Sequence, residues 1–205
     1  MFFKFHNKNK DGVQNIAVGK IKYIIAGLGN PGIKYAFNRH NAGFLALDYI
    51  SQKYDFKINT VKFKSLCAVN KFGALFMKPQ TYMNDSGAAV SEAARFYKIP
   101  PENILVISDD ISLPVGKVRV KKSGSDGGQK GLRSIIEHLS SDEFPRIKIG
   151  IGDKPHPDYE LADWVLSDFT KDEQKIIFES LAKVYECAAL FLNETPIEQI
   201  QNKYN

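Results

Sequence analysis

The chain reads Ile21-Lys22-Tyr23-Ile24-Ile25-Ala26 and continues directly as Gly27-Leu28-Gly29-Asn30-Pro31-Gly32. The first six residues have the isoleucine-rich pattern of a buried strand, and the glycines and proline after them are typical of a tight turn. Two later apolar runs also lead into polar residues, namely 74–77 into Tyr82-Met83-Asn84 and 104–107 into Ser108-Asp109-Asp110. Polar groups at the carboxyl ends of strands converge on one crevice in an open α/β sheet, so a single site is predicted here.

Strand and helix patterns alternate along the rest of the chain. Helical periodicity predicts helices over residues 41–50, 86–97, 132–139 and 171–193, and strand patterns occupy 65–70, 73–77, 116–122 and 146–152. This alternation indicates the α/β class, as a single domain with a mixed, mostly parallel twisted sheet and helices on both faces. We expect residues 21–205 to form that domain and residues 1–20 to be a loosely ordered N-terminal extension.

Composition narrows the class of protein. With 205 residues, 43% hydrophobic and 25% charged, the chain can form one substantial core, and its net charge of +5 permits a polyanionic partner. Two widely separated cysteines, Cys67 and Cys187, argue against a disulfide framework or a zinc site. The first 20 residues lack the apolar segment of a signal peptide, and no later stretch is long enough to span a bilayer. We therefore expect a cytoplasmic protein.

Residues 27–32 match the dinucleotide fingerprint G-x-G-x-x-G. The context disfavours a nicotinamide cofactor, because Pro31 and the polar, aromatic stretch 34–39 do not open a helix at once. The acid that would bind the ribose is also missing, since Asp48 falls inside a predicted helix instead of at the end of a second strand. A tight turn that needs glycine accounts for the pattern equally well.

His40 stands just before the predicted helix 41–50 and close to one of the strand ends. Asp109 follows another strand and could accept the Nδ1 proton of this histidine, leaving Nε2 as a base. The remaining histidines (His6, His138 and His156) lie in less suitable contexts. No cysteine or histidine pair has the spacing of metal ligands, so the residues favour acid–base hydrolysis over metal or thiol chemistry.

Two asparagines follow the first and second strand ends. Asn30 and Asn84 could simply be turn residues, which is a common role of asparagine. Their amides could also donate to a carbonyl oxygen and accept from an N–H, as recognition of a peptide backbone or an ester requires. The residues alone leave both interpretations open.

A local basic patch lies between Lys117 and Arg133, where six basic residues accompany one acid. Alternation places Lys117, Arg119 and Lys121 on one face of a strand, next to the glycine-rich loop 123–131. One interpretation is an edge strand protected by charge from aggregation. The other is a surface that binds the phosphates of a nucleic acid.

Taken together, these motifs resemble the bacterial-type peptidyl-tRNA hydrolases over about residues 21–200. The resemblance rests on Gly27–Gly32 with Tyr35, Arg39–Gly43, Met83-Asn84 with Ser86-Gly87, Asp109 with Leu113-Pro114, Gly127-Gly128 with Gly131-Leu132, and Gly150–Gly152. Many members read His-Asn-Gly where this chain reads Gln129-Lys130-Gly131, and a lysine can donate but cannot accept a hydrogen bond. Several independent motifs in the family's order make the resemblance specific.

The resemblance implies a metal-independent and cofactor-independent hydrolase that cleaves the ester between a peptide and the 3′ end of tRNA. It makes 21–205 the catalytic domain, His40 the general base and Asp109 the acid that orients it. The implied substrate contacts are Asn30, Tyr35, Met83, Asn84 and Lys130, and the expected tRNA contacts are Lys117, Arg119, Lys121 and Lys148. Peptidyl-tRNA is then the partner, no membrane is involved, and we expect a monomer.

One alternative is an RNA-binding protein with the same fold that no longer hydrolyses its ligand. The presence of His40, Asp109, Asn30 and Asn84 argues against it.

Overall fold

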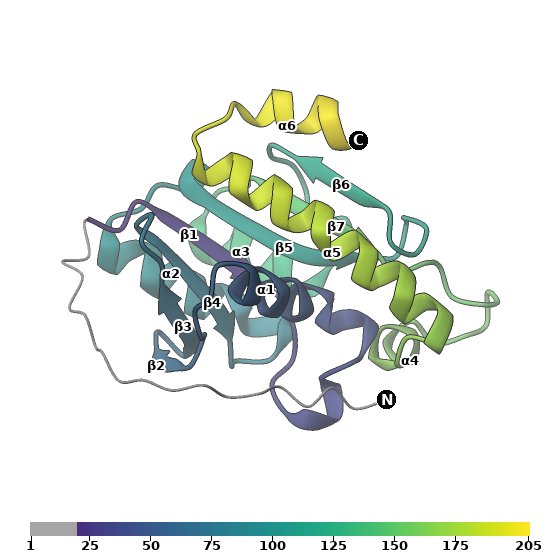
Figure 1. Ribbon diagram of the computed structural model, residues 1–205. Helices are drawn as coiled ribbons and strands as arrows, with labels where there is room; N and C mark the ends of the chain where they lie inside the picture. Colours follow the sequence, from purple (N-terminus) through teal and green to yellow (C-terminus); the bar gives the residue numbers. More distant parts are fainter. Residues whose placement is uncertain (1–19) are drawn as a thin grey trace, which may run out of the picture.

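The computed structural model describes residues 20–205, and its centre is a seven-stranded sheet with the order β2-β3-β4-β1-β5-β7-β6 (Figure 1). The strands are β1 (Tyr23–Gly27), β2 (Thr60–Lys62), β3 (Ser65–Val69), β4 (Ala74–Pro79), β5 (Ile104–Asp110), β6 (Val118–Lys121) and β7 (Arg146–Gly150). The four central strands, β4, β1, β5 and β7, run parallel. The pairings are antiparallel at both edges, between β2, β3 and β4 and between β6 and β7.

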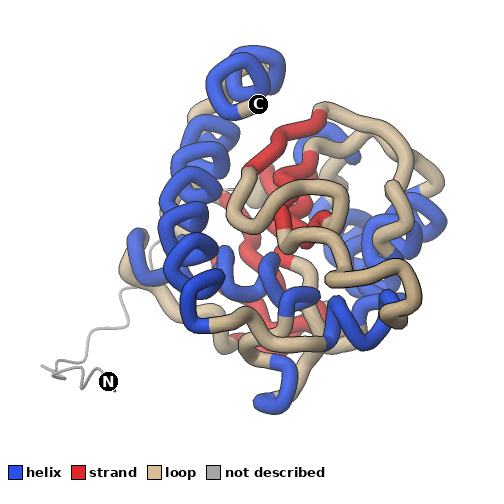
Figure 2. Tube along the Cα trace, turned by 90° about the vertical axis from the view of Figure 1, so that its right-hand side faces the viewer, coloured by secondary structure: helices blue, strands red, loops and turns tan. Residues whose placement is uncertain are grey.

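Helices cover both faces of this sheet, as the view in Figure 2 shows. On one face lie α1 (Ala42–Lys53), α5 (Lys171–Leu192) and α6 (Ile197–Tyr204), and on the other lie α2 (Ser86–Tyr97) and α3 (Lys130–Leu139). Successive strand residues alternate between the two cores, so Ile25 and Leu105 pack on the first face and Ile24 and Val106 on the second. Burial of each such side chain stabilises the folded state by about 1.5–3 kcal/mol. The α/β class and the mixed sheet with a parallel centre are confirmed.

Several elements differ from the sequence expectation. The strand predicted to end at residue 107 continues to Asp110, because its pairing with β7 extends through Asp109 opposite Ile149 and Asp110 opposite Gly150. Helix α3 begins at Lys130, before the predicted start. The short strand β2, helix α4 (Leu161–Leu166) and helix α6 were not predicted, and neither were the 3-10 helices η1 (Ile33–Tyr35), η2 (Arg39–Asn41), η3 (Met83–Asp85) and η4 (Pro101–Asn103).

The predicted extension, residues 1–20, lies outside the described residues except for Lys20. Among the helices that the structure does describe, none combines the length and the apolar character needed to cross a membrane.

Candidate active site

The carboxyl ends of three adjacent strands open into a cavity of about 460 Å³. Strand β1 lies between β4 and β5, so the segments that leave all three meet at this edge. Asn30 follows β1, Met83 and Asn84 follow β4, and Asp109 belongs to the end of β5; all four line the cavity together with His40. The structure thus brings together the three polar clusters that the sequence placed at strand ends. The volume is in the range of small-molecule sites.

His40 and Asp109 form a buried pair in the wall of this cavity. The Nδ1 atom of His40 lies 2.8 Å from Oδ2 of Asp109, and the two residues are 9% and 2% exposed. Burial lowers the pKa of His40, but the charge and hydrogen bond of Asp109 raise it, and the net pKa lies above the ordinary value of 6.5. With the Nδ1 proton donated to Asp109, Nε2 is the nitrogen that can accept a proton.

The approach of His40 to Asp109 depends on a glycine in the first turn of α1. A Cβ on Gly43 would lie 2.4 Å from both the main-chain nitrogen of Leu28 and the carbonyl oxygen of Ile107. Only glycine therefore lets α1 start this close to the ends of β1 and β5. The main-chain N–H of Phe44 donates to the carbonyl of Leu28 at 3.2 Å, which holds the start of the helix there.

Asn30 is held from two sides. Its Oδ1 accepts from the main-chain N–H of Met83 at 2.8 Å, which ties the turn after β1 to the segment after β4. The side chain of Asn41 accepts from the main-chain N–H of Asn30 at 2.8 Å and donates to its carbonyl at 3.0 Å. Within residues 20–205 the Nδ2 of Asn30 has no acceptor, so it is available to a ligand. Sequence reasoning did not assign this role to Asn41, although it directly follows His40.

Of the other predicted substrate residues, two lie on the rim of the cavity and one lies outside its lining. Asn84 is exposed on the rim, and Lys130, the first residue of α3, is exposed on the rim as well. The positive charge of Lys130 acts to lower the pKa of His40, against the effect of Asp109. Tyr35 is half-buried in η1 beside Lys34, whose Nζ lies 4.7 Å from its ring centre, and it is not part of the cavity lining.

The four predicted tRNA contacts have different surroundings. Lys148 lines the cavity, and its Nζ forms a 2.9 Å ion pair with Asp110. Lys117 donates to the main-chain oxygen of Asn205 at 2.8 Å. Val118 and Val120 are buried, as the alternation predicted, while Arg119 is half-buried and Lys121 is exposed. Within the described part of the chain, Lys121 has no side-chain hydrogen bond or ion pair.

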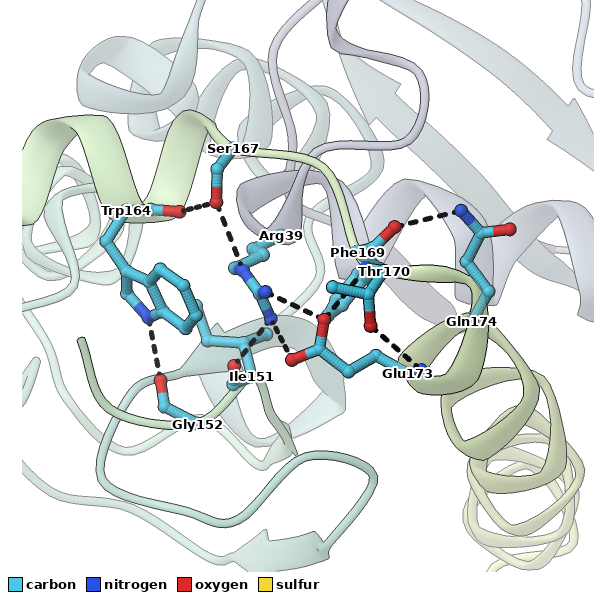
Figure 3. Close-up of polar contacts among 9 residues, drawn as sticks. All are labelled: Arg39, Ile151, Gly152, Trp164, Ser167, Phe169, Thr170, Glu173 and Gln174. Atoms are coloured by element: carbon cyan, nitrogen blue, oxygen red, sulfur yellow. Dashed lines mark hydrogen bonds and ion pairs between the residues drawn. The ribbon is translucent and has the colours of Figure 1, made fainter. Parts of the chain in front are cut away.

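Arg39, the residue before His40, is the buried centre of the network of polar contacts shown in Figure 3. Its guanidinium makes a bidentate ion pair with Glu173, at 2.9 and 2.8 Å, and also donates to the carbonyl of Ile151 at 3.1 Å. The group lies 3.7 Å from the ring centre of Trp164, and Nε donates to Ser167 at 3.2 Å. Arg39 therefore fixes η2 to α4, to the end of β7 and to the start of α5.

Helix α4 forms an apolar wall of the cavity. Leu161, Ala162, Val165 and Leu166 line it, and Leu161 and Leu166 keep 44% and 40% of their surface exposed. The wall was not predicted, because the segment is only six residues long and follows a proline-bearing loop.

The cavity is also bounded by the glycine-rich loop, whose residues Gly127 to Lys130 contribute to its lining. In the part of the chain that the structure describes, no group of three or more His, Cys, Asp or Glu side chains is arranged to hold a metal ion. The polar groups that line the cavity include the histidine–carboxylate pair, the amides of Asn30, Asn84 and Gln129, and two lysines, Lys130 and Lys148.

Comparison with known proteins gives a consistent result. A family model described as peptidyl-tRNA hydrolase matches residues 24–205. The chain is similar to the peptidyl-tRNA hydrolase of Caldicellulosiruptor bescii, with 47% identity over 186 residues, which cover 89% of this chain and 96% of the relative. The peptidyl-tRNA hydrolase of Clostridium botulinum strain Hall is 46% identical with the same coverage. A crystal structure of the Acinetobacter baumannii peptidyl-tRNA hydrolase matches with a TM-score of 0.83 and 33% identity, covering 91% of this chain and 95% of that one.

Proposed function

The chain belongs to the peptidyl-tRNA hydrolase family and is a hydrolase, and from this premise we propose which of its residues cleave the ester between the peptide and the tRNA. His40 is the general base and Asp109 is the residue that orients it. The observation that carries this assignment is the 2.8 Å contact between His40 Nδ1 and Asp109 Oδ2 at the wall of the cavity. We assign residues 21–205 as the catalytic domain.

The reaction begins when Nε2 of His40 takes a proton from a water molecule as that water attacks the ester carbonyl. Asp109 stabilises the imidazolium that forms, because its carboxylate accepts a hydrogen bond from Nδ1–H and carries the opposite charge. When the ester C–O bond breaks, His40 returns the proton to the 3′ oxygen of the tRNA, and the peptide leaves as a carboxylic acid. General acid–base catalysis of this kind contributes about 10²-fold to 10⁴-fold, and fixing the ester beside the water contributes further.

Amide and ammonium donors hold the substrate during these steps. The free Nδ2 of Asn30 and the exposed side chain of Asn84 bind the peptide backbone, and Met83 with the α4 wall contacts its apolar side chains. Lys130, at the start of α3, donates to the carbonyl oxygen as negative charge develops there. Tyr35 lies outside the cavity lining, so we assign it only to contacts with parts of the substrate that extend beyond the cavity.

We place the tRNA body on the exposed face of β6, next to the glycine-rich loop. Lys121 is the leading contact there, with Lys117, Arg119 and Lys148 as further basic groups. Lys148 can bind a phosphate only in competition with Asp110. The described chain supplies all of the groups named in this mechanism, so we propose that it acts as a monomer, in the cytoplasm where peptidyl-tRNA is formed.

The direct test compares N-acetyl-aminoacyl-tRNA with unblocked aminoacyl-tRNA. We expect release of the N-blocked amino acid and little release of the free one, because the site binds a peptide amide and not a charged amine. Equal release would indicate a general esterase. Binding of tRNA without any release would favour an RNA-binding protein that lacks hydrolysis.

The variant Asp109→Asn should hydrolyse the tRNA ester more slowly while keeping its thermal stability. The amide has nearly the same shape, but its NH₂ group cannot accept the Nδ1 proton and favours the wrong tautomer of His40. For a triad aspartate, the same change lowers kcat by about 10⁴-fold, and we expect a loss of at least ~10²-fold here. Single-turnover release at neutral pH measures it, and an unchanged rate would move the orienting role to another group.

The variant Lys121→Ala should weaken tRNA binding in a salt-dependent manner. Each lost phosphate contact lowers the slope of log affinity against log salt by about 0.7 to 0.9. The matched control is Lys71→Ala, which removes the same charge from the turn between β3 and β4. Cleavage of a short substrate that lacks the tRNA body should be unaffected in both. If the salt dependence of tRNA binding in Lys121→Ala equals that of the unmodified protein, the basic residues of β6 only protect an edge strand from aggregation and do not bind tRNA.

A further inference from the structure

We propose that Gln129 is a positioning residue for the reaction, because its amide holds the Asp109 carboxylate in the orientation that His40 requires. The Nε2 of Gln129 donates to Oδ1 of Asp109 at 2.9 Å, while Oδ2 of the same carboxylate receives His40 at 2.8 Å. Each carboxylate oxygen is thus held by a different residue. Rotation of the Asp109 carboxylate out of its present plane would weaken both hydrogen bonds. The inference rests on the proposed roles of His40 and Asp109.

The orientation of the Gln129 amide follows from its second contact. Gln129 is the N-cap of α3, and its Oε1 accepts from the main-chain N–H of Leu132 at 2.7 Å. If the amide were flipped, its NH₂ would face that N–H and its oxygen would face the carboxylate, and both contacts would become repulsive. The backbone of α3 therefore determines that Gln129 presents a donor to Asp109.

The residues around Gln129 leave it little freedom. Its Nε2 lies 3.1 Å from Sδ of Met83. A Cβ on Gly131 would lie 2.5 Å from that sulfur and 3.0 Å from Oε1 of Gln129, so glycine is needed at position 131 for this packing. The amide is thus enclosed between the carboxylate, the first turn of α3 and the segment that follows β4.

The loop that presents Gln129 is itself anchored by Arg146, which is 1% exposed and lies on β7. Its guanidinium donates to the carbonyls of Gly124, Ser125 and Asp142 and lies 4.2 Å from the ring centre of Phe144. Arg146 ties the beginning of the glycine-rich loop to the sheet, and among residues 20–205 its guanidinium has no hydrogen bond to a carboxylate. A loop fixed in this way can keep the amide of Gln129 within hydrogen-bond distance of Asp109.

A neutral amide suits this position for an electrostatic reason. The titratable or charged groups that share the cavity with His40 are Asp109 and Asp110 on β5, Lys148 on β7, Lys130 on α3 and Tyr82. Gln129 adds a hydrogen bond to Asp109 and no charge, so it fixes the geometry of the pair without altering the balance among these groups.

Two substitutions separate this role from simple capping of α3. Gln129→Ser keeps a side-chain oxygen that can cap the helix, but it is too short to reach Asp109. Gln129→Met retains the length and loses both functions. We expect kcat for N-acetyl-aminoacyl-tRNA to fall roughly tenfold to a hundredfold in both variants, as for loss of a bond to a charged group, with KM nearly unchanged. The proton NMR signal of His40 Nδ1 should shift or broaden in both.

The matched control is Asp126→Asn, which alters the charge of the same loop but keeps an oxygen to accept from Gly128, as Asp126 does at 2.6 Å. Its kcat should stay within about twofold of the unmodified protein. Wild-type kcat and an unchanged His40 signal in Gln129→Ser would overturn the inference, and would leave Gln129 as a helix cap. His40→Ala is assayed in parallel: if that variant keeps the rate, the proposed base is wrong, whatever the Gln129 variants do.

Discussion

Replacement of His40 by alanine should lower kcat for N-acetyl-aminoacyl-tRNA by roughly 10²-fold to 10⁴-fold, the range that a general base contributes. The variant lacks the only imidazole that lines the cavity within the described chain. It keeps Asn30, Asn84 and the basic face of β6, so the affinity for tRNA should change little. Single-turnover release measures the chemical step, and filter binding of deacylated tRNA measures the affinity.

The control for this experiment is His138→Ala. His138 lies on α3, and its Nδ1 is 2.9 Å from the carbonyl oxygen of Ser134, outside the cavity lining. Its loss should leave turnover unaltered. If His40→Ala kept more than about a tenth of the rate at neutral pH while folding normally, another group would have to be the base.

Replacement of Arg39 by alanine should reduce the free energy of unfolding by about 1.5–3 kcal/mol, the range for loss of hydrogen bonds to a charged group, because the Glu173 side chain left behind is still 21% exposed. Arg39 is 2% exposed, and the Glu173 carboxylate would lose both of its bonds to the guanidinium. The ring of Trp164, labelled beside Arg39 in Figure 3, would lose the guanidinium that lies 3.7 Å from its centre. Urea unfolding at neutral pH measures the loss.

The matched control is Lys175→Ala in the first turns of the same helix. Lys175 pairs with Asp172 at 3.0 Å, but both side chains are largely exposed. Such surface pairs contribute about 0–1 kcal/mol, so this variant should unfold almost as the unmodified protein does. An equal effect of the two substitutions would contradict a special role of the Arg39 network.

The pH dependence of stability provides a second measurement on Arg39→Ala. Burial acts to raise the pKa of Glu173, but the hydrogen bonds from Arg39 and Thr170 outweigh it, and the pKa lies below the ordinary value of 4.5. A carboxyl group with a lowered pKa in the folded state stabilises the protein above the unfolded pKa, and the contribution is lost as the pH falls through the folded pKa. We therefore expect the acid-induced loss of stability to be smaller in Arg39→Ala than in the unmodified protein.

Features that depend on neighbouring residues could be predicted from the sequence. Apolar runs of strand length, helical periodicity and glycine-rich turns are local patterns, and they were sufficient for the α/β class and for the position of polar residues at three strand ends. The α1 position of Asp48 also followed from local periodicity, and it removed the dinucleotide interpretation. Short elements such as α4 and η2 carry too few residues for a period to be recognised, and they were missed.

The sequence predicted the approach of His40 to Asp109, but the other contacts of the site became known only from the folded chain. His40 and Asp109 are separated by 69 residues, Gln129 and Asp109 by 20, and Arg39 and Glu173 by 134, so no local pattern records the contacts. Lys148 was expected only as a tRNA contact, and its ion pair with Asp110 arises because β5 and β7 are paired side by side. Side-chain type is a property of the chain, but distance between side chains is set by strand register and by close approaches such as that at Gly43, which depend on the folded backbone.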